Sequence, residues 1–173
     1  ADVVRVAETF IIDDPKYFSD TKEFINLKIE TKDSFAYKYY AMSILKDLVK
    51  LNLNNPIPLI DVELKRINFI YNNYVGNDKD ALYFEALKRL EKKEPKLAIT
   101  GEVSYEIANY YYSLGNRYNP NMGETNKWEF KKAYDICAEV INKFPNSLAG
   151  INCAALQSKI RAKTLTITVE EVN

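Results

Sequence analysis

Apolar residues recur every three or four positions along most of this chain, which is the spacing of amphipathic helices. Such stripes predict a short helix near 15–26 and six main helices at 34–52, 58–75, 78–93, 100–118, 126–144 and 147–163. Residues 1–32 are otherwise expected to be an irregular lead-in. The pattern therefore predicts an all-α fold built from antiparallel helical hairpins.

Helix-breaking residues mark the ends of these stretches. Pro56 and Pro58 separate the first two main helices, because proline cannot continue a helix. Gly76 is expected to close the second main helix as a C-cap, and Pro145 to end the fifth. The connections are short, so neighbouring helices should lie side by side and antiparallel.

The closing segment KTLTITVEEVN, residues 163–173, follows a different rule. Leu165, Ile167 and Val169 alternate with polar residues, which predicts a half-buried strand. An unpaired strand leaves backbone hydrogen bonds unmade. We therefore expect residues 164–173 to begin a following β-domain, after a helical domain at 1–163. Without that domain the strand would fray, lie on the helices, or pair with a second copy or with VVRV at 3–6.

Residues 111–118, YYSLGNRY, resemble the first helix of a tetratricopeptide repeat. The repeat has the spacing W-x2-L-G-x2-Y, followed by a second helix with A-x3-F and a closing proline. The matching residues here are Tyr111, Leu114, Gly115, Tyr118, Ala133, Cys137, Val140 and Pro145, with Tyr in place of Trp and Cys in place of Phe. The span from Tyr118 to Ala133 is longer than the repeat allows, so residues between them should form an extended loop.

A degenerate copy of the second helix of this repeat occurs earlier in the chain. Its residues are Tyr83, Leu87, Leu90 and Pro95, and their spacing is that of Ala133, Cys137, Val140 and Pro145. These two matches to the repeat pattern predict a tetratricopeptide-like, right-handed stack of about six helices. In such a stack small residues such as Gly115 and Ala133 allow neighbouring helices to approach closely.

Composition excludes most catalytic chemistries. The 24 basic and 24 acidic residues cancel, which argues against a nucleic-acid or anionic-membrane partner. The chain has no His, so Ser-His-Asp triads, Cys-His pairs and HExxH zinc sites are excluded. Its 5 Gly residues form no phosphate-binding motif, and its 2 Cys residues lack metal-ligand spacing. We therefore expect no catalytic residue, no cofactor and no metal site.

The two cysteines suggest a covalent link instead. Cys137 lies eight residues before Pro145 and Cys153 lies eight after it, so a hairpin turning at Pro145 would place them at the same height. Close helix packing can provide the Cα separation that a disulfide needs. One hypothesis is a disulfide, which would indicate an oxidising compartment; the other is a pair of buried free thiols.

Several stretches resemble the helical region that precedes the macroglobulin domains in very large alpha-2-macroglobulin-like proteins of Gram-negative bacteria. They span about residues 15–173: LIDVELKRINFIYNN, DALYFEALKRLEKK, SYEIANYYYSLGNRYNP, KWEFKKAYDICAEVINKFPNSLAGINCAAL and LTITVEEVN. In that family the last stretch opens the first macroglobulin β-sandwich. The family's bait region and CxEQ thioester motif are not in this sequence, so no residue of the protease trap is carried over.

The resemblance implies an exported protein of the periplasm or cell envelope, often a lipoprotein, belonging to a family of protease inhibitors. The helical part would be a non-enzymatic scaffold, spacer or docking surface. Its partners would be proteins: other domains of the same chain, a protease or an envelope protein. No run of about 18 apolar residues is present, so no membrane span is expected in this segment.

Two other functions stay open at this point. An independent tetratricopeptide-type adaptor would bind a peptide or a partner protein. A small helical enzyme or ligand carrier would need a carboxylate site that the sequence does not reveal. If the family resemblance is right, the natural reading frame continues past Asn173 into β-rich sequence.

Overall fold

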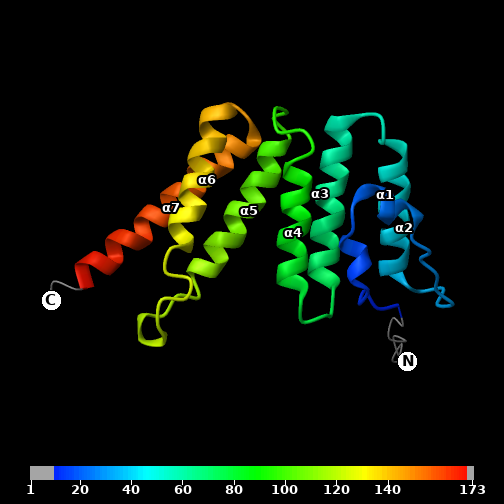
Figure 1. Ribbon diagram of the computed structural model, residues 1–173, viewed down its shortest axis with the longest axis horizontal. Helices are drawn as coiled ribbons and strands as arrows, with labels where there is room; N and C mark the ends of the chain where they lie inside the picture. Colours follow the sequence, from blue (N-terminus) through cyan, green and yellow to red (C-terminus); the bar gives the residue numbers. More distant parts are fainter. Residues whose placement is uncertain (1–9, 171–173) are drawn as a thin grey trace, which may run out of the picture. The chain divides into compact units, whose positions relative to one another are not determined.

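The computed structural model describes the backbone of residues 10–170 and the side chains of residues 10–163. Within this part the chain is helical, as the apolar spacing predicts (Figure 1). The elements are the 3-10 helices η1 and η2 and seven α-helices: η1 Pro15–Phe18, α1 Thr21–Asn26, α2 Tyr37–Leu51, α3 Pro56–Asn73, α4 Lys79–Glu91, α5 Thr100–Gly115, η2 Pro120–Met122, α6 Glu129–Lys143 and α7 Leu148–Glu170.

The helices group into two compact units, Ala1–Leu90 and Glu91–Asn173. The first contains η1 and α1 to α4, and the second contains α5, η2, α6 and α7. The division between residues 90 and 91 does not test the predicted domain boundary at residue 163, which stays a prediction.

The predicted short helix at 15–26 is in fact two short helices, each with its own side-chain cap. Asp14 accepts a hydrogen bond from the Lys16 amide at the start of η1. Asp20 accepts one from the Glu23 amide at the start of α1. An aspartate at the N-cap satisfies an amide that has no partner inside the helix, so Asp20 begins a new helix where periodicity alone would continue the first.

The lead-in is anchored in the core of the first unit. Ile12 is fully buried and forms an isolated parallel bridge with Tyr74, and the Val75 amide donates to the Ile12 carbonyl at 3.1 Å. The ring of Phe18 meets that of Tyr74 edge to face, with centroids 5.5 Å apart. The segment before α1 is therefore irregular but packed, with its place set by contacts to the end of α3.

The ends of α3 differ from the prediction. The helix begins at Pro56, whose missing amide costs nothing in the first turn. It ends at Asn73 with Tyr74 as the C-cap, so Gly76 is not the C-cap. A Cβ on Gly76 would lie 2.3 Å from the Tyr74 ring. Glycine is needed there to leave room for this ring, not to end the helix.

Helices α5, α6 and α7 pack on one another in the second unit. The long loop before α6, predicted from the spacing of the repeat, occupies residues 116–128 and turns through positive φ at Gly123 and Asn126. The core of the unit is apolar and rich in small side chains: Ala108, Ala133, Cys137, Val140, Ala149, Cys153, Leu156 and Ile160. Small residues at facing positions let the helix backbones approach closely.

The predicted C-terminal strand is not observed. Helix α7 continues to Glu170, so the positions of Leu165, Ile167 and Val169 are helical. A helix satisfies its backbone hydrogen bonds internally, whereas a strand needs a neighbouring strand. Residues 171–173 and the proposed partner segment at 3–6 lie outside the described residues.

No helix in the described part is long and apolar enough to span a bilayer.

Gly150, in the first turn of α7, provides a test of the packing in the second unit. A Cβ there would lie 2.4 Å from the Phe144 carbonyl oxygen. Helix propensity alone predicts that Gly150→Ala stabilises the protein by roughly 0.5–1 kcal/mol. We expect the opposite sign, a loss of about 1–3 kcal/mol, because backbone atoms must move. Urea unfolding followed by circular dichroism measures the change, and stabilisation would contradict the observed packing. Ser158→Ala, on the exposed face of α7, should shift stability by no more than about 0.5 kcal/mol.

Candidate functional site

The structure brings together the two cysteines that the sequence singles out. Cys137 of α6 and Cys153 of α7 are both fully buried in the core of the second unit. Both are free thiols, and their side chains are hydrogen-bonded to each other. The hairpin formed by α6 and α7 therefore places them in contact, and whether they form a disulfide stays a prediction.

The two thiols of this pair differ in acidity. The hydrogen bond to Cys153 and burial both raise the pKa of the Cys137 thiol, whereas the hydrogen bond to Cys137 lowers the pKa of the Cys153 thiol. The thiolate is the reactive form of cysteine, and buried thiols in apolar surroundings are inert. In this buried position the pair can act as a packing contact or, once oxidised, as a covalent staple.

The other predicted repeat residues lie mainly at helix contacts of the second unit. Ala133 and Val140 are buried in the core. Gly115 is buried, and a Cβ on it would lie 2.8 Å from the Phe130 ring of α6. Three are partly buried and one, in the turn between α6 and α7, is exposed: Tyr111, Leu114, Tyr118 and Pro145. Small residues therefore occupy the close approaches and larger ones surround them.

The most concentrated polar chemistry lies in the first unit, where it was not predicted. Arg66 of α3 is paired with Glu63 one turn earlier, with Nε and Oε2 2.6 Å apart and side chains only 2% and 1% exposed. The guanidinium also stacks over the Phe24 ring of α1, 4.2 Å from its centroid. A sequence signal existed, because Glu63 and Arg66 are charged residues at i,i+3 within the apolar face of this helix.

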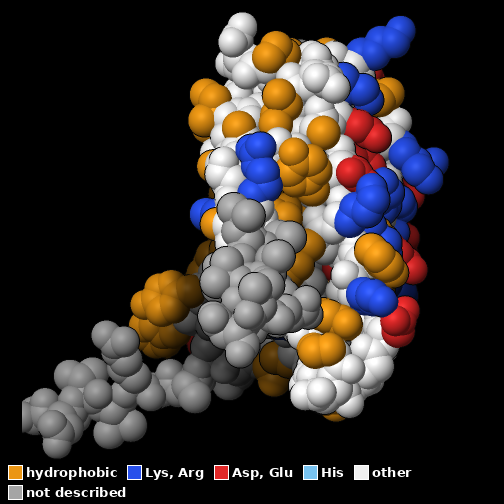
Figure 2. Space-filling view, turned by 90° about the vertical axis from the view of Figure 1, so that its left-hand side faces the viewer, with side chains coloured by type: hydrophobic (Ala, Val, Ile, Leu, Met, Phe, Trp, Pro, Cys, Tyr) orange, Lys and Arg blue, Asp and Glu red, His pale blue; other side chains and the backbone are white. Residues whose placement is uncertain are grey.

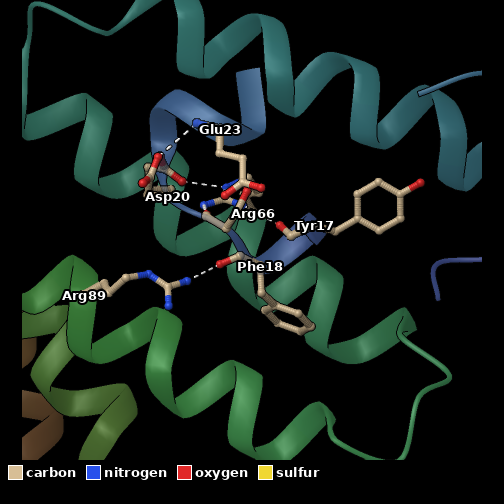
Figure 3. A network of polar contacts seen from close by, with 8 residues as sticks. Tyr17, Phe18, Asp20, Glu23, Arg66 and Arg89 are labelled. Atoms are coloured by element: carbon tan, nitrogen blue, oxygen red, sulfur yellow. Dashed lines mark hydrogen bonds and ion pairs between the residues drawn. The ribbon is translucent and has the colours of Figure 1, made fainter. Parts of the chain in front are cut away.

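The guanidinium groups of two helices hold the segment between η1 and α1 (Figure 3). Arg66 donates to the carbonyl of Tyr17 at 2.6 Å and to that of Ser19 at 2.9 Å. Arg89 of α4 donates to the carbonyl of Phe18, which lies between them in sequence. Carbonyl groups at the end of a helix have no partner within that helix. Here the two arginines provide donors for three such carbonyls in succession.

Electrostatics agree with a structural role for Arg66. Burial lowers the pKa of Arg66, and the nearby Glu63 carboxylate raises it by attraction and hydrogen bonding. Arginine nevertheless stays charged in proteins. The ion pair therefore places a permanent positive charge inside the first unit, where its donors hold backbone oxygens.

A surface depression of about 370 Å³ adjoins this network. It is lined by Pro15, Lys16, Phe18, Ser19, Asp20, Glu23, Leu82 and Arg89. Its charged groups include Arg89, which binds a backbone carbonyl, and Asp20, which caps α1. In the described part of the chain no cluster of three or more His, Cys, Asp or Glu side chains could hold a metal ion.

Comparison with protein-family models, with curated proteins and with solved structures gives no match. Neither a family nor a fold relative is shown by these comparisons. The chemistry of the first unit and the cysteine pair of the second both serve packing, so the functional argument rests on surfaces and on the sequence resemblance.

Replacing Arg66 tests the buried network. Arg66→Met removes the ion-pair partner of the buried Glu63 and the donors to the carbonyls of Tyr17 and Ser19, so we expect a loss of about 3–5 kcal/mol in stability. Hydrogen exchange should also accelerate in η1 and α1. The neighbouring exposed pair of Lys65 and Asp61, 2.6 Å apart, offers a matched control. Lys65→Met should cost about 0–1 kcal/mol, and equal losses for the two variants would contradict the role of Arg66.

The cysteine pair predicts a simple redox response. In a glutathione buffer poised at an oxidising potential, we expect Cys137 and Cys153 to form an intramolecular disulfide with loss of two hydrogens. After denaturation without reductant, alkylation should then add no label, and mass spectrometry should link the two peptides. A closed loop of this size should raise stability by about 3 kcal/mol. Labelling of both thiols after this treatment would favour permanently free, packed cysteines.

Proposed function

We propose that this chain is a non-enzymatic helical scaffold and interaction domain of a bacterial alpha-2-macroglobulin-like protein in the periplasm or cell envelope. The observation that carries the proposal is the use made of the guanidinium and thiol groups, one of which, Arg89, is exposed. Arg66 and Arg89 are both engaged with backbone carbonyls, and the buried thiols contact each other. Such groups stabilise a platform. The family assignment comes from the sequence stretches named above.

The packing of the second unit supports a tetratricopeptide-like arrangement. Helices α5, α6 and α7 contact one another in succession, and α5 also contacts α7. In a tetratricopeptide stack each helix likewise packs on the next two. Gly115 and Ala133, the small residues of the repeat pattern, are both buried in this unit. The right-handed stacking of such repeats is part of the proposal.

A free-standing adaptor that binds a peptide or a partner protein is the second candidate. Figure 2, which views the molecule from the side of α6 and α7, shows apolar side chains over this face while basic and acidic side chains gather toward one edge. Leu148 and Ile151 of α7 are 60% and 61% exposed. Apolar side chains on an outer helix face favour contact with another protein.

The full-length natural gene product distinguishes the two functions. We expect a much larger protein in which β-rich sequence follows residue 173, and we expect a tagged version to fractionate with the periplasm or envelope. In spheroplasts an added protease should degrade it, while a cytoplasmic reporter stays intact as the control. A stop codon directly after residue 173, or a cytoplasmic product, would contradict the proposal. Saturable binding of extended peptides by the isolated product would then favour the adaptor.

A further inference from the structure

Helix α2 has a second apolar face that is largely exposed. Its inner face is buried through Met42 and Val49. Its outer face carries five large side chains, which are 38–76% exposed: Tyr37, Tyr40, Ile44, Leu48 and Leu51. They lie at i, i+3, i+7, i+11 and i+14, which places them in one stripe along the helix. We call this set the outer stripe.

The outer stripe is comparable in size to the largest apolar patch of a typical monomeric protein, and such patches are often functional. Single exposed apolar residues are normal on monomeric proteins, but contiguous patches rarely exceed a few hundred Å². Five such side chains, about half exposed, present on the order of 500 Å² of surface. Two copies of the stripe would bury on the order of 1,000 Å² in total, which is the size at which specific interfaces begin.

The outer stripe is symmetric about Ile44. Tyr40 and Leu48 lie four residues before and after it, and Tyr37 and Leu51 lie seven before and after it. In an antiparallel pair of identical helices related by a two-fold axis, residues at equal distances on either side of the axis meet. Ile44 would then meet its own copy, and each tyrosine would meet a leucine. A stripe with this symmetry is complementary to itself.

We propose that α2 is the interface of a homodimer, in which the outer stripes of two copies pack antiparallel with Ile44 on the two-fold axis. The proposal stands independently of the function proposed above. Two observations indicate that the partner covering the outer stripe is a second copy of this chain. The spacing of the stripe is symmetric about Ile44, and two copies together bury the area that a specific dimer needs.

The polar residues beside the stripe fit this arrangement. Asp47 lies on the same flank as Tyr40, and in the antiparallel pair the Asp47 carboxylate of one copy comes level with Tyr40 of the other. The Tyr40 hydroxyl donates a long hydrogen bond of 3.4 Å to the Ser34 carbonyl, and it could donate to that carboxylate instead. Lys38 and Lys50 also come level, but they lie on opposite flanks of the helix and stay apart.

Sedimentation equilibrium tests the interface. We expect the wild-type protein to show a monomer–dimer equilibrium at concentrations up to about 100 µM, as befits an interface of modest size. Ile44→Asp should weaken the dimer at least tenfold, because two carboxylates would meet on the axis. Met122→Asp is the control for a new charge at an exposed apolar position, since Met122 of η2 is 82% exposed, and it should leave the dimer unchanged. Thermal unfolding of both variants checks that they are folded.

Cysteine cross-linking tests the register. Under mild oxidation Ile44→Cys should form a disulfide-linked dimer with itself. Tyr37→Cys should not cross-link with itself, but it should do so when mixed with Leu51→Cys. Wild-type protein, whose native cysteines are buried, shows the background.

Three results would overturn the proposal. A wild-type monomer throughout the concentration range would leave the outer stripe to a helix of another protein. A dimer that Ile44→Asp leaves intact would place the interface elsewhere. Self-linking of Tyr37→Cys would show a parallel pair.

Discussion

The first unit depends on one buried cation. The three successive carbonyls of Tyr17, Phe18 and Ser19 lie at the end of η1 and in the turn to α1. Arg66 and Arg89 satisfy them from two different helices. Glu63 balances the charge of Arg66 from one turn away, and the Phe24 ring covers the guanidinium. A buried pair of this kind is costly to assemble, and much costlier to break on one side.

The second unit is held together by the packing of small apolar side chains and not by a buried charge. Its core contains alanines and the two cysteines, which allow α5, α6 and α7 to approach closely. Two glycines of this unit, Gly115 and Gly150, lie where a side chain would collide with the Phe130 ring and with the Phe144 backbone, respectively. Packing of this type tolerates apolar exchange of equal volume but not the addition of a methyl group.

The polar groups described above take part in packing, so the exposed surfaces of the helices are the better candidates for a function. The buried Arg66 and the exposed Arg89 both bind backbone carbonyls, and the two buried thiols contact each other. The exposed apolar faces differ in this respect. The outer stripe of α2 and the outer residues of α7 are both apolar surface that the described part of the chain leaves uncovered, and a protein partner is the natural occupant of such a face.

Much of the helical architecture followed from periodicity alone. The spacing of apolar residues correctly predicted the six main helices, and the longer loop before α6 followed from the excess of residues between Tyr118 and Ala133. Local rules failed where two signals competed. Asp20 capped a second helix inside one apolar run, and Gly76 served the Tyr74 ring rather than the end of α3. The strand predicted around Ile167 is helical instead, because alternation does not supply a strand with a partner.

The candidate sites show the same division. The sequence by itself determined that Cys137 and Cys153 face each other, because both distances are counted along one hairpin. The spacing of the outer stripe is also a property of a single helix, but its exposure was decided by the tertiary structure. Only the tertiary structure decided that Arg66 is buried and that its partners are carbonyls of Tyr17 and Ser19, almost fifty residues away. Contacts within a helix or hairpin follow from spacing, whereas contacts between distant segments depend on how the whole unit packs.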